Sequence, residues 1–202
     1  MPREGGLISY RICRALLRFL VISIWRWDIE GLENIPADGP VIIVANHISY
    51  WDPVLIGVAL TRRVFFMGKK ELFAIPVLGF LLKSWGVFPV DRAHPDRGAI
   101  RRALDLLRSG QIIGIFPEGT RSKTGALLPP STGAAYFAIR TGAPVCPAAI
   151  IEVKGRTSWG LFRRLSLRLG PMMSFAGNNK EQADEAAGCM MFKIQELIDL
   201  QS

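Results

Sequence analysis

Two kinds of hydrophobic segment alternate along the chain. Short apolar runs occur at Val41–Ala45 and, after Gln111, within residues 111–116, and such runs are typical of strands buried on both faces of a sheet. Other segments carry apolar residues every three or four positions, as at residues 95–109 and 181–200, and predict amphipathic helices. The alternation indicates an α/β fold with a central, mostly parallel or mixed sheet flanked by helices.

Shorter patterns predict the remaining elements. We expect strands over residues 26–30, 64–67, 85–90, 145–153 and 165–169, and helices over residues 53–60 and 132–141. Residues 72–82 contain Pro76 and Gly79, so they predict short helical pieces. Pro147 interrupts the strand expected over residues 145–153. Because proline cannot donate to a sheet ladder, it favours an edge or bulged position there.

The first 25 residues predict an N-terminal amphipathic helix. Arg11, Arg14 and Arg18 recur at helical spacing opposite apolar residues, a pattern typical of helices that lie in the membrane interface. A terminal helix packed on its own domain is the alternative. The arginines interrupt the roughly 20 apolar residues that a membrane span requires, and no cleavage site of a signal peptide follows. We therefore expect a membrane-interface helix over residues 1–25 and one globular domain over residues 26–202.

Composition narrows the class of protein further. With 202 residues, half of them hydrophobic, the chain can bury one core but not two independent ones. Its net charge of +8 predicts an anionic partner: a membrane surface, a phosphorylated substrate, an acidic carrier or nucleic acid. Cys13, Cys146 and Cys189 are odd in number and widely spaced, which disfavours a disulfide framework. With His47 and His94 as the only histidines, no metal site of the usual His/Cys spacing is expected.

One candidate for chemistry follows the apolar run Val41–Ala45. His47 comes just after this run, and Asp52 stands five positions later, directly before Pro53. An acceptor side chain followed by proline usually begins a helix, so His47 is expected in a strand-to-helix turn, where ligands of α/β sheets bind. Asp52 could then hold one ring nitrogen while the other acts as a base on a substrate hydroxyl. The alternative is a helix-capping aspartate beside a histidine with no chemical role.

A second polar cluster follows the strand expected over residues 111–116. Its members are a carboxylate, a glycine, a hydroxyl and a guanidinium: Glu118, Gly119, Thr120 and Arg121. Glycine lets a ligand approach the backbone closely, and arginine is the side chain best shaped for phosphate. This strand-end turn is therefore a second candidate for the functional site.

Taken in order, these motifs resemble those of the glycerolipid acyltransferase family, specifically the 1-acylglycerol-3-phosphate (lysophosphatidate) acyltransferases. Asn46, His47 and Asp52 are similar to the family's His-x4-Asp motif, and residues 86–92 are similar to its second block. Residues 116–122 match the third block closely, and residues 143–147 are similar to the fourth, with Cys146 where an aliphatic residue is frequent. The resemblance spans residues 27–174.

The resemblance implies a role for each motif. His47 and Asp52 supply the catalytic dyad of an acyltransferase domain. The acceptor and its phosphate are assigned to Arg92, Glu118, Gly119, Thr120 and Arg121. By charge, Lys69 and Lys70 are further candidates for the phosphate. The acyl donor is a thioester, either acyl-CoA or acyl carrier protein, and the product is phosphatidic acid for phospholipid biosynthesis.

Acyl transfer of this kind needs a base, donors for the oxyanion and aligned substrates. Backbone amides near Gly119 are candidate oxyanion donors. No cofactor or metal is expected, and Ser49 and Cys146 are disfavoured as nucleophiles because neither lies in a Gly-x-Ser-x-Gly elbow and Cys146 lies in an apolar strand. With no spanning helix predicted, we expect a peripheral or monotopic protein on the cytoplasmic face of the membrane, with membrane lipids as partners.

Other classes of protein fit part of the sequence. A non-catalytic protein that binds anionic lipids would use the same basic residues, but it would not need a histidine paired with a carboxylate. A nucleic-acid-binding domain would explain the charge, yet the arginines are dispersed and no recognisable nucleic-acid module is present. Among enzymes, an acyltransferase that acts on another lysophospholipid or hydroxyl acceptor is the alternative.

Overall fold

The central strand of the fold is the apolar run that stands out in the sequence. The computed structural model describes residues 14–19, 27–91, 93–94, 96–153 and 164–200. Strand β2 (Val41–Ala45) is buried at every position. Val41 and Ile43 belong to one hydrophobic core and Ile42 and Val44 to another, because successive side chains of a strand point to opposite faces. The run is apolar throughout because both faces of the sheet are covered.

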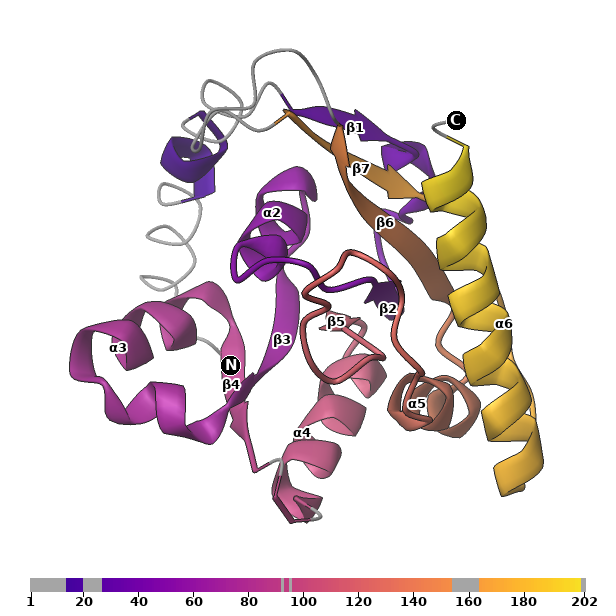
Figure 1. Ribbon diagram of the computed structural model, residues 1–202. Helices are drawn as coiled ribbons and strands as arrows, with labels where there is room; N and C mark the ends of the chain where they lie inside the picture. The colour runs from indigo at the N-terminus through magenta and orange to yellow at the C-terminus, as the bar shows by residue number, and fades with distance from the viewer. Residues whose placement is uncertain (1–13, 20–26, 92, 95, 154–163, 201–202) are drawn as a thin grey trace.

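The fold is an α/β domain with a mixed sheet (Figure 1), as predicted. Within the described residues, seven strands are ordered β1-β7-β6-β2-β5-β3-β4. Besides β2, the strands are β1 (Asp28–Glu30), β3 (Val64–Lys69), β4 (Val87–Val90), β5 (Ile112–Ile115), β6 (Val145–Val153) and β7 (Arg164–Leu169). All neighbouring strands are parallel except β6 and β7, which are antiparallel.

Helices cover both faces of this sheet. The α-helices that follow β1 are α2 (Asp52–Ala59), α3 (Pro76–Trp85), α4 (Arg97–Arg108), α5 (Gly133–Thr141) and α6 (Lys180–Asp199), and the 3-10 helices are η1 (Leu32–Asn34) and η2 (Lys70–Ala74). The core beneath α2 also takes in Trp85 of α3. The core on the opposite face is formed with α4, α5 and α6, and Figure 1 shows α2 and α6 on opposite sides of β2 and β6.

The sheet order brings the predicted motifs to one edge. β2 and β5 are parallel neighbours, with Val44 opposite Ile115, so the turns that follow them meet. β3 pairs with β5, and β4 pairs with β3. The segments after these four strands contain His47, Glu118, Lys70 and Asp91, and all four segments leave the sheet at the carboxyl ends of the strands, where ligands of open α/β sheets bind.

Two predictions of local structure were wrong. Trp85 ends α3 instead of beginning a strand, because Gly86 adopts a left-handed conformation with φ of 95° that stops the helix. Pro147 is not at an edge, because β6 pairs with β2 on one side and β7 on the other. Pairing with β7 begins only at Ala148, and the Pro147 carbonyl accepts a hydrogen bond from the Gly170 amide just past β7. Pro147 therefore lies just past the end of the ladder between β6 and β7, where a residue without an N–H is tolerated.

The N-terminal segment can be described only in part. Residues 14–19 are helical, whereas most of the predicted amphipathic helix, Arg11 included, lies outside the described residues. Arg14 donates to the Leu60 carbonyl, and Arg18 donates to the carbonyls of Val58 and Ala59 at the end of α2. These two arginines thus interact with the protein's own backbone. Among the residues that the structure describes, no helix has the length and apolar character to cross a membrane.

Candidate active site

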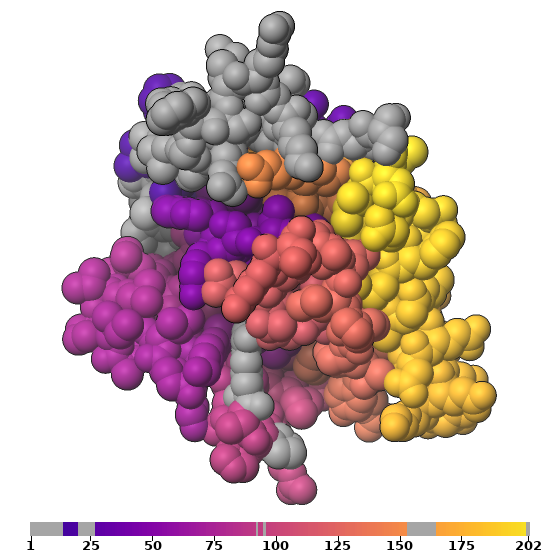
Figure 2. All heavy atoms as spheres, in the orientation of Figure 1, coloured from indigo at the N-terminus to yellow at the C-terminus, as the bar shows by residue number. Residues whose placement is uncertain are grey.

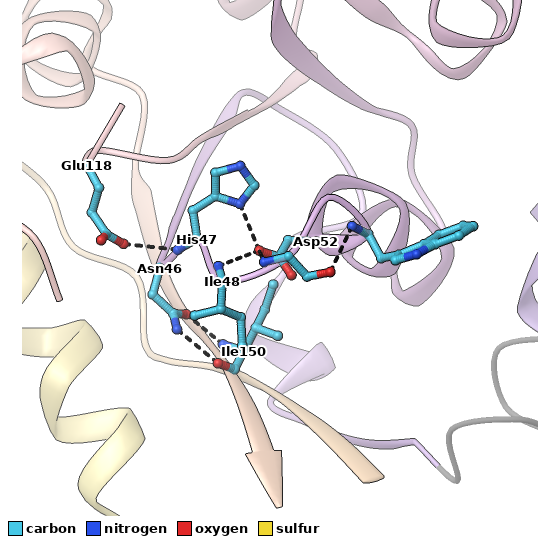
Figure 3. A network of polar contacts seen from close by, with 8 residues as sticks. Asn46, His47, Ile48, Asp52, Glu118 and Ile150 are labelled. Carbon is cyan, nitrogen blue, oxygen red and sulfur yellow. Dashed lines mark hydrogen bonds and ion pairs between the residues drawn. The ribbon is translucent and has the colours of Figure 1, made fainter. Parts of the chain in front are cut away.

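The predicted histidine and aspartate form a hydrogen-bonded pair at the carboxyl end of β2. The Nδ1 atom of His47 lies 2.7 Å from Oδ2 of Asp52, and Figure 3 shows the opposite edge of the ring turned away from Asp52. If Nδ1 carries the proton, it donates to the carboxylate and leaves Nε2 with a lone pair. Such a tautomer suits a base that acts at Nε2.

Both side chains of the pair are held by further contacts. The Asp52 side chain has no solvent exposure, and Oδ2 also accepts hydrogen bonds of 2.7 Å from the amides of Ile48 and Ser49. The His47 ring stacks on Phe116, with 4.1 Å between the ring centroids, and its side chain is 15% exposed. The pair is therefore fixed on its inner side and reachable from solvent at the histidine.

Asn46 connects the start of this turn to β6. Its Oδ1 accepts from the Ile150 amide at 2.8 Å, and its Nδ2 donates to the Ile150 carbonyl at 2.9 Å (Figure 3). The side chain thereby takes the place of a neighbouring strand for one residue of β6. Asn46 is 2% exposed. The sequence analysis placed Asn46 in a motif but did not predict its pairing with Ile150. The only signal for this pairing was a polar residue directly after a buried strand.

Glu118 joins the turn after β5 to the turn that carries His47. One carboxylate oxygen accepts from the His47 amide at 2.9 Å, and the other accepts from the Leu128 amide at 3.0 Å. A further bond of 2.8 Å runs from the Ser122 amide to the His47 carbonyl. Glu118 is predicted to bind the acceptor, and in the structure it is 9% exposed and holds the backbone on both sides of the site.

The rest of the loop after β5 presents groups outward. Gly119 has φ of 68°, a conformation that favours glycine, and its amide donates to the Phe116 carbonyl at 3.0 Å. That amide is thus already engaged. Thr120 is exposed and Arg121 is half-buried. The guanidinium carbon of Arg121 lies 3.4 Å from the centre of the Tyr50 ring, so the two turns also meet at the surface.

The predicted phosphate-binding groups on the β3 and β4 side are only partly described. Lys70 is paired with Asp91 and Lys69 with Glu71. The hydrogen bond from Lys70 lowers the pKa of the Asp91 carboxyl, and Asp91 in turn raises the pKa of Lys70. Arg92 lies outside the described residues, and its role stays a prediction.

The two other residues considered as nucleophiles, Cys146 and Ser49, are not activated for attack. Cys146 is buried in β6, and burial raises the pKa of its thiol to about 12, so it is a thiol and not a thiolate near neutral pH. The Ser49 hydroxyl accepts from the Trp51 amide at 3.2 Å. Among the described residues, no group of three or more His, Cys, Asp or Glu side chains is arranged to hold a metal ion.

Comparison with known proteins shows which proteins the chain is similar to. A family model described as "Acyltransferase" matches residues 26–151. The chain is 35% identical over 179 residues to a 1-acyl-sn-glycerol-3-phosphate acyltransferase of Bacillus subtilis, covering 88% of this chain and 85% of the relative. It is 37% identical over 134 residues to the chloroplastic 1-acyl-sn-glycerol-3-phosphate acyltransferase BAT2 of Brassica napus, covering 65% of this chain but only 39% of the relative.

A solved structure is similar over nearly the whole chain. It is the crystal structure of the 1-acyl-sn-glycerophosphate (LPA) acyltransferase PlsC from Thermotoga maritima, which superposes with a TM-score of 0.68 at 25% sequence identity. The match covers 96% of this chain and 88% of the other. The fold expected from the sequence is thus also the fold of a solved relative.

Proposed function

The chain belongs to the acyltransferase family, and from this premise we propose that it transfers an acyl chain from an acyl thioester to the free sn-2 hydroxyl of 1-acylglycerol-3-phosphate. The product is phosphatidic acid, an intermediate of phospholipid biosynthesis. The single observation that supports the chemistry best is the 2.7 Å contact between His47 Nδ1 and the buried carboxylate of Asp52.

In the proposed reaction His47 acts as a general base. Nε2 takes the proton of the acceptor hydroxyl, and the oxygen attacks the thioester carbonyl carbon. The new carbon–oxygen bond forms, the carbon–sulfur bond breaks, and the departing thiolate takes the proton from Nε2. Asp52 stabilises the imidazolium that exists between these steps, because its Oδ2 accepts from Nδ1. No covalent bond to the protein is needed.

The acceptor phosphate is proposed to bind on the side of the loop after β5. Arg121 offers a planar guanidinium that can form two parallel bonds to phosphate, and Arg92 is the second candidate. Glu118 supports this arrangement by fixing the backbone of His47 and Leu128, and a direct contact of Glu118 with the glycerol is a further part of the proposal. Since Lys70 is paired with Asp91, we propose that it contributes less to phosphate binding than Arg121.

The proposed acceptor is a lipid, so we also propose that the protein binds a membrane surface peripherally. Exposed apolar side chains on the helical residues 14–19 and around α3 support this: Leu16, Phe19, Ile75, Val77, Phe80 and Leu81. Val77, Phe80 and Leu81 have the helical spacing of one stripe, and Lys83 lies in the last turn of the same helix. Apolar side chains beside cations suit an interface of anionic lipids.

The test is acyl transfer by the purified protein. Labelled 1-acylglycerol-3-phosphate is incubated with acyl-CoA or with an acyl thioester of acyl carrier protein, and the lipid products are separated. We expect phosphatidic acid from the wild type and at least a 10²-fold lower rate from His47→Ala, since a positioned base contributes roughly 10²- to 10⁴-fold. Asp52→Asn should lose nearly as much activity.

Controls separate the chemistry from the fold. His47→Ala should unfold at a lower denaturant concentration than the wild type, because the ring stacks on Phe116 and pairs with the buried Asp52. Its activity is therefore compared in denaturant-free buffer, where circular dichroism shows a folded protein. Monoacylglycerol, which lacks the phosphate, should be a poor acceptor. Substantial activity in folded His47→Ala protein would overturn the mechanism, and transfer to other lysophospholipids at equal rates would overturn the proposed acceptor.

A further inference from the structure

Tyr50 has no role in the proposed reaction, although it lies inside the turn that carries His47 and Asp52. It is the most exposed of the large hydrophobic residues in the described structure, at 74%. Its ring faces Arg121, whose guanidinium carbon is 3.4 Å from the ring centre. Figure 2 shows the purple segment near residue 50 against the salmon segment that follows β5, on the face turned to the viewer.

The distance defines the geometry of this contact. At 3.4 Å the guanidinium carbon is in van der Waals contact with the ring, so the guanidinium plane must lie nearly parallel to the ring, because a tilted plane would drive a nitrogen into it. A guanidinium stacked in this way keeps its N–H donors in a plane that projects beyond the ring. Among the described residues, neither the Arg121 guanidinium nor the Tyr50 hydroxyl has a hydrogen-bond or ion-pair partner.

We propose that Tyr50 is a positioning residue for the acceptor phosphate: its ring holds the Arg121 guanidinium flat, with the donor edge free for a phosphate monoester. This inference rests on the proposed function and assigns a task to a residue outside the dyad. The attraction between ring and cation restricts the rotation of a long side chain that would otherwise sample many rotamers in solvent, so less freedom is lost when phosphate binds.

The stacking also links the phosphate-binding arginine to the turn that carries the base. Tyr50 belongs to the turn of His47, and Arg121 belongs to the turn of Glu118. The two turns are already joined by the bonds from the Ser122 amide to the His47 carbonyl and from the His47 amide to Glu118. The contact of Arg121 with Tyr50 is a third link between the two turns, and it connects the phosphate-binding guanidinium to the turn that carries His47.

The experiment measures steady-state kinetics of Tyr50→Ser and Tyr50→Phe in the full chain. The acceptor is a short-chain 1-acylglycerol-3-phosphate dispersed below its micelle concentration, so that adsorption to a lipid surface does not enter the result. We expect Tyr50→Ser to raise the KM for the acceptor about two- to fivefold, the effect of one exposed cation–π contact. The donor KM should stay unchanged. Tyr50→Phe should behave as wild type, because the phenol hydroxyl has no partner among the described residues.

A double-variant cycle makes the test specific. Arg121→Ala should raise the acceptor KM more than Tyr50→Ser does, and adding Tyr50→Ser to Arg121→Ala should have no further effect. Tyr136→Ser, a half-exposed tyrosine on α5 whose ring contacts Phe137, serves as the matched control and should leave both KM values unchanged.

The outcomes separate this inference from the proposed function. If the wild type makes no phosphatidic acid, the proposed function fails and the role of Tyr50 fails with it. If the wild type is active, the inference alone is overturned by any of three results: an unchanged acceptor KM in Tyr50→Ser, equal increases in the KM of both substrates, or an undiminished effect of Tyr50→Ser in the Arg121→Ala background.

Discussion

Asn46 is expected to stabilise the fold through its two hydrogen bonds to β6, and Asn46→Ala tests this. The asparagine side chain makes both of its hydrogen bonds with the backbone of Ile150, at 2.8 and 2.9 Å, and it is 2% exposed. Alanine would leave the N–H and the C=O of Ile150 buried without these partners. Each unpaired buried group costs about 1 to 3 kcal/mol, so the variant should lose about 2 to 6 kcal/mol of unfolding free energy.

Equilibrium unfolding in urea measures this loss. With a denaturant dependence of about 2 kcal/mol per M, which is ordinary for a small protein, the midpoint should fall by roughly 1 to 3 M. Asn34→Ala is the matched control, since Asn34 donates one bond of 2.9 Å to the Leu169 carbonyl from a partly buried position. Its loss should be about 0.5 to 1.5 kcal/mol. An Asn46→Ala midpoint equal to that of the wild type, or above that of Asn34→Ala, would refute the reasoning.

Two further predictions concern the surface and the core. Leu16 and Phe19 are 61% and 70% exposed, so replacing both with serine should release the protein from anionic liposomes in a sedimentation assay. The unfolding midpoint should stay the same. An unchanged fraction of liposome-bound protein would contradict the proposed membrane contact. Burial raises the pKa of Cys146 to about 12, so iodoacetamide at pH 8 should modify the exposed Cys189 and leave Cys146 intact. Peptide masses measure which cysteine is modified. Modification of Cys146 in folded protein would contradict this prediction.

The parts of the fold that the sequence predicted well are those dominated by burial. β2 has the predicted bounds because a short, β-branched apolar run is typical of a strand covered on both faces. Pro147 was misjudged because a local rule about proline does not say which neighbour a strand has at each position. The antiparallel partner β7 stops one residue short of Pro147, which only the tertiary structure reveals.

The site divides in a similar way. The sequence predicted the contact of His47 with Asp52 because both residues lie within one turn. It did not predict that Glu118 would accept from the His47 amide, 71 positions away, nor that Arg14 would donate to the end of α2. A charged residue in a sequence does not show which group, if any, it will contact. Which partner it has depends on elements that meet only when the sheet forms.

The same geometry predicts that one spacing in this site tolerates no insertion whereas another does. Asp52 Oδ2 must reach His47 Nδ1 and the amides of Ile48 and Ser49 at once, each at 2.7 Å. These donors lie within a single turn, so inserting one residue between His47 and Asp52 would move the carboxylate off all three. The contact with Glu118 is different, because it depends on β2 and β5 being parallel neighbours. The elements between them, β3 to α4, can change in length as long as that pairing is kept. We therefore expect an insertion between His47 and Asp52 to abolish the three contacts of the carboxylate, and an insertion in a loop between β3 and α4 to leave the contact of Glu118 with the His47 amide intact.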